Sequence, residues 1–301
     1  MKKLLFLIAL LGQTVFAQQI NVKSVELLKC TEAGGYCFAM YSPQGTYLLT
    51  STANYTGLKQ ITLATGEVKT ITQEPGAGYD VKISADESTI LFKKTEFIDK
   101  LRYTSLHQYS FTDKKTTQVE KATREKLTPA FTQNEPMYAK GNKNLVKSAK
   151  AVLTTPVVTI EDMKMVVYSG NTSKVLTPNG VDATYFWASV SPDGKHIVYY
   201  TTATQSTFVC NIDGTNVVSL GKINAPAWLN NQWIVGMDDK DDGHVMLSST
   251  IVAVTANGKI RQTLATPSLK IAMYPAASPD GKQIAFENEN GQIYLMNIDI
   301  K

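Results

Sequence analysis

The densest group of residues able to do chemistry is an acidic run in the last third of the chain. The run Asp238–Asp242 is followed by Gly243 and His244. Carboxylates that alternate ahead of a glycine supply the oxygen ligands that a hard cation such as Ca²⁺ prefers. The spacing lacks the full EF-hand pattern and its distal glutamate. Two interpretations stay open: a calcium site with ligands Asp239, Asp241 and Asp242, or a solvated acidic loop.

Other residue types that support catalysis are sparse. The only histidines are His107, His196 and His244, no Gly-x-Ser-x-Gly elbow occurs, and no two histidines have zinc-ligand spacing. His196 opens a predicted strand, which favours a structural role. Acids from distant segments could still converge for glycoside chemistry, because sequence distance hides such pairs. An enzyme is therefore not favoured, and no cofactor other than calcium is expected.

The three cysteines permit one disulfide. Cys30 and Cys37 flank a glycine-bearing segment that could bring two strand ends together, and Cys210 lies in an apolar strand. A bridge requires a narrow range of Cα separations that sequence cannot verify. The bridge is left open, and Cys210 is expected to be a buried free thiol.

The first residues of the chain have the features of a targeting signal. Residues 1–17 combine Lys2 and Lys3, an apolar run and a small-residue end at Ala17, the three zones of a secretory signal. No cysteine follows that could receive a lipid, and no later stretch approaches the ~20 apolar residues of a membrane helix. We expect a periplasmic or secreted protein, not a lipoprotein, with no membrane span and a single domain over residues 18–301.

Composition excludes one class of partner. The 301 residues contain 30 basic and 26 acidic side chains, so no strong excess of positive charge is available for a polyanion such as nucleic acid. The length suffices for a large core in one all-β domain. A monomer that binds no nucleic acid is expected.

A repeated turn organises the elements that must position these residues. Ser191–Lys195 and Ser278–Lys282 share the sequence Ser-Pro-Asp-Gly-Lys, and alternating apolar residues follow each copy. Proline second and glycine fourth suit a tight turn that opens a half-buried strand. Weaker copies place six anchors along the chain, at Ser42, Ser84, Thr132, Ser191, Leu229 or Asn230, and Ser278; Leu229 serves as the fifth anchor.

The anchors recur at the ~40 to 50 residue period of four-stranded propeller blades. The strands are short and rich in Val, Ile, Thr, Tyr and Phe, and helical periodicity is absent. The last repeat lacks a strand, while an unassigned strand, residues 20–28, opens the mature chain. The sequence thus predicts an all-β, six-bladed propeller of four-stranded antiparallel blades, closed by the N-terminal strand completing the last blade.

The repeated Ser-Pro-Asp-Gly-Lys turn, its apolar strand, an Asp-Gly turn and a closing Leu176-Thr177 resemble the repeat of TolB-like propellers. The family's frequent tryptophan before the turn occurs only as Trp228, and the N-terminal α/β domain of TolB itself has no counterpart. The resemblance implies architecture and no single activity, since similar propellers also accompany peptidase and polysaccharide-lyase chemistry.

The six copies differ most at the position four residues before each anchor. In a propeller, this position and the loop between the second and third strands lie at one mouth of the central channel. Exposed aromatic side chains there would offer large contact area at low entropic cost, although packing between blades explains them equally well. The six residues are Phe38, Asp80, Thr128, Trp187, Ala225 and Tyr274.

Charge gives the mouth a second asymmetry. The third repeat carries an insert with Lys140, Lys143, Lys147 and Lys150, and acids gather in the last two repeats. The pattern favours a non-catalytic binding or scaffold propeller for a protein or peptide of the envelope, or for a glycan, at the channel mouth. The alternative is a hydrolase or lyase with carboxylates that converge in the channel.

Overall fold

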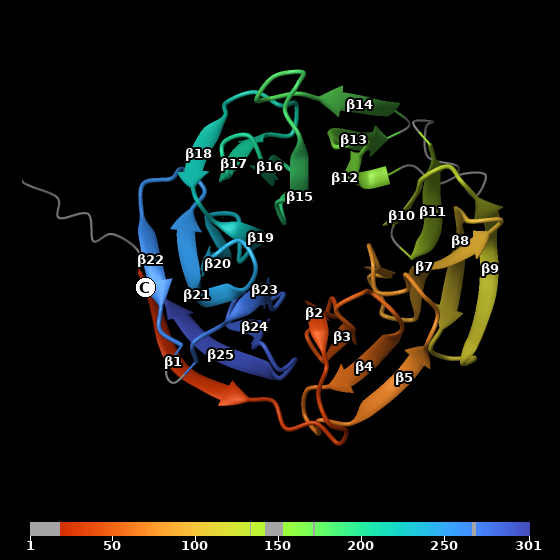
Figure 1. The fold of residues 1–301 in the computed structure, drawn as a ribbon, viewed down its shortest axis with the longest axis horizontal. Helices are drawn as coiled ribbons and strands as arrows, with labels where there is room; N and C mark the ends of the chain where they lie inside the picture. Colours follow the sequence, from red (N-terminus) through yellow and green to blue (C-terminus); the bar gives the residue numbers. More distant parts are fainter. Residues whose placement is uncertain (1–18, 133, 142–152, 171, 267–268) are drawn as a thin grey trace, which may run out of the picture.

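The computed structural model describes residues 19–132, 134–141, 153–170, 172–266 and 269–301. The regular structure of these residues consists of β-strands alone. The strands form antiparallel sheets that stand like spokes around a central channel (Figure 1). The predicted all-β, six-bladed propeller is confirmed.

Five blades are regular four-stranded sheets, in which the first-named strand lies next to the channel. The first contains β2 (Cys37–Tyr41), β3 (Tyr47–Ser51), β4 (Leu58–Thr62) and β5 (Val68–Thr72), and the second β6 (Lys82–Ile83), β7 (Thr89–Ile98), β8 (Leu101–Ser110) and β9 (Lys115–Thr123). The fourth contains β15 (Tyr185–Val190), β16 (His196–Thr201), β17 (Ser206–Asn211) and β18 (Val218–Gly221), and the fifth β19 (Asn224–Trp228), β20 (Trp233–Asp241), β21 (Met246–Thr255) and β22 (Arg261–Leu264). The sixth contains β23 (Met273–Ala277), β24 (Gln283–Glu287), β25 (Ile293–Ile300) and β1 (Ile20–Leu27).

The third blade is divided into two sheets. β10 (Leu127–Thr132) pairs with β11 (Glu135–Lys140), and β12 (Leu153–Glu161) pairs with β13 (Lys164–Gly170), which pairs with β14 (Thr172–Leu176). The two sheets pack together through a small apolar cluster that includes Met137 and Tyr168. Of the predicted insert lysines, Lys140 forms ion pairs with Glu120 and Glu125. Lys143, Lys147 and Lys150 lie outside the described residues.

The N-terminal strand closes the ring as predicted. β1 pairs antiparallel with β25 from Ile20↔Ile300 to Leu27↔Tyr294. Ile20 is only 1% exposed and packs in the cluster between the fifth and sixth blades. The side chain of Gln262 on β22 accepts a hydrogen bond from the Ile20 amide at 3.0 Å and donates one to the Ile20 carbonyl. The first strand is therefore bound to two neighbouring blades.

The repeated turn fixes each inner hairpin through its serine and aspartate. Ser191 Oγ donates to Asp193 at 2.6 Å and accepts from the His196 amide at 2.9 Å. Gly194 has a φ of 74°, a conformation that glycine adopts without steric cost. The same bonds recur at Ser278, with distances of 2.6 and 2.9 Å. The turn is structural, as its repetition implies.

The core consists of layers between adjacent blades, because successive side chains of a strand point to opposite faces of its sheet. Ile284 and Phe286 pack against the fifth blade, whereas Ala285 between them packs against the first. Cys210 is buried and free, and Cys30 and Cys37 are not bridged.

Within the described part of the chain, no helix could cross a membrane. The predicted signal segment, residues 1–17, lies outside the described residues.

The closing strand yields a stability test. Replacing Ile20 by alanine removes buried methyl groups from the seam, so we expect a loss of about 2 to 5 kcal/mol of unfolding free energy. Urea unfolding measures the loss, and Glu26→Ala, at an exposed position of the same strand, should change stability by no more than about 0.5 kcal/mol. Equal stability of the two variants would contradict closure by this strand.

Candidate functional site at the channel mouth

Five of the six predicted mouth positions share an unusual backbone conformation. Their φ angles are 57° at Phe38, 58° at Asp80, 50° at Trp187, 46° at Ala225 and 49° at Tyr274. In the first, fourth, fifth and sixth blades the inner strand also shifts register at this point, which marks a β-bulge. Left-handed backbone is strained for residues with a side chain, and such strain often accompanies functional sites.

Thr128 is the exception, because the third blade is built differently. β10 pairs with β11 without a register shift, with Thr128 opposite Ala139. A β-branched residue strongly resists a positive φ, which agrees with this regular strand. Thr128 is 1% exposed, so its side chain is buried beneath the surface of the mouth.

Aromatic side chains form a continuous row across the first blade. Tyr274 contacts Phe38 edge to face at 4.8 Å between ring centroids, and Phe38 stacks on Tyr55 at 4.4 Å. Tyr55 contacts Tyr79 at 5.4 Å, and Lys93 Nζ lies 5.1 Å from the centroid of the Tyr79 ring. We call Tyr274, Phe38, Tyr55 and Tyr79 the aromatic row. Trp187 stands apart on the fourth blade, 43% exposed and in contact with Tyr200 at 5.1 Å.

Two large hollows lie in the described part of the structure. One, of about 610 Å³, lies between the inner strands, is lined mostly by apolar residues such as Ala227 and Trp228, and extends to the turn residues Pro43 and Pro279. A larger cleft of about 920 Å³ lies at the mouth, between loops of the first three blades, and is lined by Tyr55 and Tyr79 of the aromatic row. We call this second hollow the mouth cleft. Its lining includes Tyr55, Tyr79, Lys93, Phe97, Arg102, Arg124, Lys126 and Asp162.

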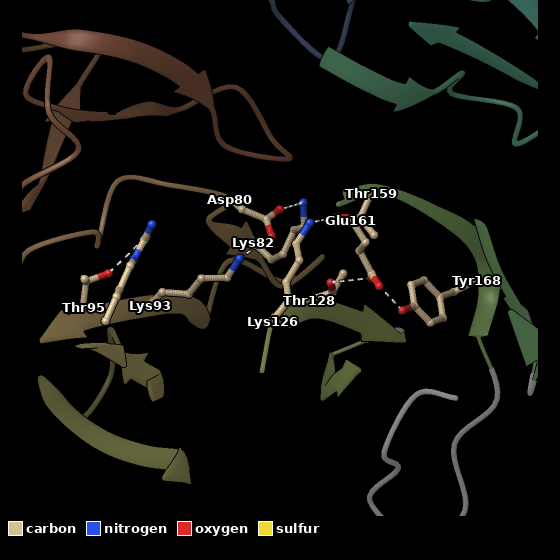
Figure 2. A network of polar contacts seen from close by, with 10 residues as sticks. Asp80, Lys82, Lys93, Thr95, Lys126, Thr128, Thr159, Glu161 and Tyr168 are labelled. Carbon is tan, nitrogen blue, oxygen red and sulfur yellow. Dashed lines mark hydrogen bonds and ion pairs between the residues drawn. The ribbon is translucent and has the colours of Figure 1, made fainter. Parts of the chain in front are cut away.

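A polar network forms the floor beside the mouth cleft (Figure 2). Asp80 accepts ion pairs from Lys82 and Lys93, each at 2.8 Å. Although burial opposes ionisation, these two lysines lower the pKa of Asp80 to about 2. Asp80 therefore stays charged and holds the buried Lys93 in place.

The second half of the network centres on Glu161 at the end of β12. Glu161 is 4% exposed and its Oε1 accepts hydrogen bonds from Tyr168 at 2.8 Å and Thr128 at 3.3 Å. Nearby, Lys126 Nζ donates to Thr159 Oγ1 at 3.3 Å. Figure 2 shows these groups side by side between the second and third blades.

Glu287 supports the aromatic row from below. Its Oε2 accepts a hydrogen bond from the Phe38 amide at 2.7 Å, across the seam between the sixth and first blades. Glu287 is 2% exposed, and burial raises its pKa to about 7, with hydrogen bonds from Phe38 and Cys37 opposing the rise. The bond holds the bulge that presents the Phe38 ring.

The sequence analysis did not single out Lys93, Glu161 or Glu287, although the sequence contains a pattern that marks them. Lys93 follows the apolar run Ile90–Phe92, Glu287 follows Ile284–Phe286, and Glu161 follows the β-branched run Val157–Ile160. A charge at the end of an otherwise buried strand needs a buried partner. The partners themselves come from other segments, and no sequence pattern revealed the mouth cleft.

The acidic run differs from the expected loop. Residues 238–241 extend β20 and pair with β21, so Asp238 and Asp239 face opposite sides of the sheet. Asp238 pairs with Arg261 at 2.7 Å, and Asp239 accepts from Asn224 at 2.6 Å. Asp241 and Asp242 accept backbone hydrogen bonds within their own turn. No group of three or more His, Cys, Asp or Glu side chains that could hold a metal occurs among the described residues.

Comparison with known proteins identifies the fold of this chain and no family. No family model and no curated protein matches this sequence. Among solved structures, TolB from Acinetobacter baumannii aligns over 81% of this chain and 57% of its own, with a TM-score of 0.54 and 14% identity. The chain shares a β-propeller fold with TolB. It spans 57%, less than two thirds, of the TolB chain that it matches.

Other propellers align with this chain at similar TM-scores. The β-propeller domain of Cps50 (Swd1) from Myceliophteria thermophila has a TM-score of 0.55 and 9% identity, covering 92% of this chain and 100% of that domain. A chain of a mitotic checkpoint complex has a TM-score of 0.56 and 10% identity, covering 99% and 98%. Identities this low describe the fold alone.

The buried carboxyl of Glu287 predicts a pH dependence. A raised pKa means that its contribution to stability is complete below its ordinary pKa of 4.5 and is lost as pH rises through about 7. A glutamine at this position would keep an acceptor for the Phe38 amide but cannot ionise. From pH 4 to pH 8 the wild type should lose about 3 kcal/mol relative to Glu287→Gln. Urea unfolding at both pH values tests this, with the exposed Glu289→Gln as control; parallel pH profiles would refute it.

The calcium interpretation is tested by thermal unfolding. If Asp239, Asp241 and Asp242 bind Ca²⁺ in the folded state, calcium at 100 times its Kd should stabilise the protein by about 2.7 kcal/mol and raise Tm relative to a chelator. Asp241→Asn with Asp242→Asn should abolish the rise. A Tm unmoved by calcium or chelator identifies the run as a structural and solvated turn.

Proposed function

We propose that this propeller is a non-catalytic binding or scaffold module of the cell envelope or the secreted fraction, with a protein, peptide or glycan ligand at the channel mouth. The observation that carries the proposal is the mouth cleft itself: about 920 Å³ in volume and continuous with the aromatic row through Tyr55 and Tyr79. Concave sites with aromatic walls and a few charged groups are typical ligand sites.

The construction of the row supports binding. Phe38 and Tyr274 are held in left-handed backbone, and Tyr79 keeps 45% of its surface exposed. Aromatic rings fixed by their neighbours give contact area with little loss of side-chain entropy on binding. Contacts between neighbouring rings therefore hold the aromatic row in place and leave part of its surface exposed to a ligand.

No specific observation favours the hydrolase or lyase alternative. The buried carboxylates near the mouth each have partners: Asp80 has two lysines, Glu161 has Tyr168 and Thr128 on Oε1, and Glu287 has the Phe38 amide. Glu161 Oε2 is buried without a hydrogen-bond partner among the described residues. An acid and base pair for glycoside chemistry needs two carboxyl groups facing one substrate bond. The arrangement supports structure and presentation better than acid catalysis.

Ligand selection on the full chain tests the proposal. We expect a display library of random peptides or a glycan array to yield ligands, and Tyr55→Ala with Tyr79→Ala to weaken their binding at least about tenfold, because two ring contacts are lost. Val175→Ala with Val217→Ala is the matched control, since both side chains are exposed and lie on or beside outer strands. Ligands that bind the Tyr55/Tyr79 variant as well as wild type would place the site elsewhere and refute the proposal.

A further inference from the structure

The mouth cleft is lined by four basic residues, Lys93, Arg102, Arg124 and Lys126, against two acidic ones, Glu125 and Asp162. Lys93 is balanced by Asp80. Among the described residues, Arg102 donates only to Thr95 Oγ1, at 3.5 Å, and Lys126 only to Thr159 Oγ1, at 3.3 Å. Among these described residues, no carboxylate lies within ion-pair distance of Arg102, Arg124 or Lys126. The side chains of Arg102, Arg124 and Lys126, all of which line the mouth cleft, are thus available to a ligand.

The surroundings of Lys126 also favour a negatively charged ligand. Lys126 is half-buried, and burial, followed by the charge of Lys93, lowers its pKa, although the carboxylates of Glu161, Asp80 and Asp162 oppose the shift. A negative group placed beside Lys126 would offset both its burial and the repulsion from Lys93. An anion is therefore the ligand that the cleft favours electrostatically.

The hairpin beside the cleft offers apolar contacts. β7 and β8 have ten residues each, against five each for β3 and β4, so the hairpin tip projects about 15 Å further. Phe97 is 71% exposed, Ile98 47% and Leu101 42%. Phe97 pairs directly with Arg102, and both line the mouth cleft. Grouped exposed apolar side chains of this kind mark protein interaction surfaces.

We infer that the mouth cleft binds an acidic, apolar-rich segment of a peptide or protein partner. Its carboxylates face Arg102, Arg124 and Lys126, and its apolar side chains contact the hairpin tip and the aromatic row. Guanidinium groups bind carboxylates in a bidentate geometry. The aliphatic tip distinguishes this occupant from an acidic polysaccharide, because Ile98 and Leu101 gain from apolar side chains that a charged sugar polymer lacks.

The inference rests on the proposed function and narrows its ligand. Its test compares peptide pools selected from a random display library on three versions of the full chain: wild type, Arg124→Gln with Lys126→Met, and Lys114→Gln with Lys115→Gln. Lys114 and Lys115 are exposed lysines at the far end of β8 from the hairpin tip, so the last version removes the same charge elsewhere. Circular dichroism and urea unfolding establish that each version is folded.

We expect wild type and the Lys114/Lys115 control to enrich Asp and Glu together with Leu and Phe. The cleft variant should lose the acidic enrichment and bind wild-type-selected peptides at least about tenfold more weakly, with a reduced salt dependence. Pools without acidic enrichment, or equal binding by the cleft variant, overturn the inference. Neutral ligands that still require Tyr55 and Tyr79 would leave the proposed function intact, whereas no Tyr55- and Tyr79-dependent ligand at all would remove both.

Discussion

The pairing of the first strand with the last is the constraint on which the rest of this structure depends. Without β1, the sixth blade would end in an unpaired edge at β25, and an open edge of this kind invites aggregation. Gln262 binds Ile20 from the fifth blade as well, so the closing strand fixes two blades at once. A closed ring is what holds six separate hairpin units around one channel.

Closure also positions the candidate site. The contact between Tyr274 and Phe38, and the hydrogen bond from the Phe38 amide to Glu287, both cross the seam between the sixth and first blades. The aromatic row then leads away from that seam to Tyr79 and Lys93 on the second blade. The shape of the mouth is therefore a property of the assembled ring.

Local sequence predicted the parts whose physics is local. The Ser-Pro-Asp-Gly turn closes its hairpin with bonds among six adjacent residues, from Ser191 to His196, so the repeat could be read directly. The third blade was harder to predict, because its strands form two sheets that pack through residues far apart in the chain, such as Met137 and Tyr168. The acidic run was expected to be a loop, yet pairing with β21 extends the strand through Asp241.

The sequence by itself determined the all-β class, the six repeats, the strand that closes the ring and the position in each repeat where the copies differ. These follow from turn chemistry and alternation within about fifty residues. Only the tertiary structure decided which of those positions meet, since Tyr55 and Arg124 are far apart in the chain and line one cleft. It also decided which charges are paired: Lys93 has Asp80, whereas Arg102, Arg124 and Lys126 have no carboxylate within ion-pair distance among the described residues. Charge balance depends on distances between blades, and a linear sequence does not contain those distances.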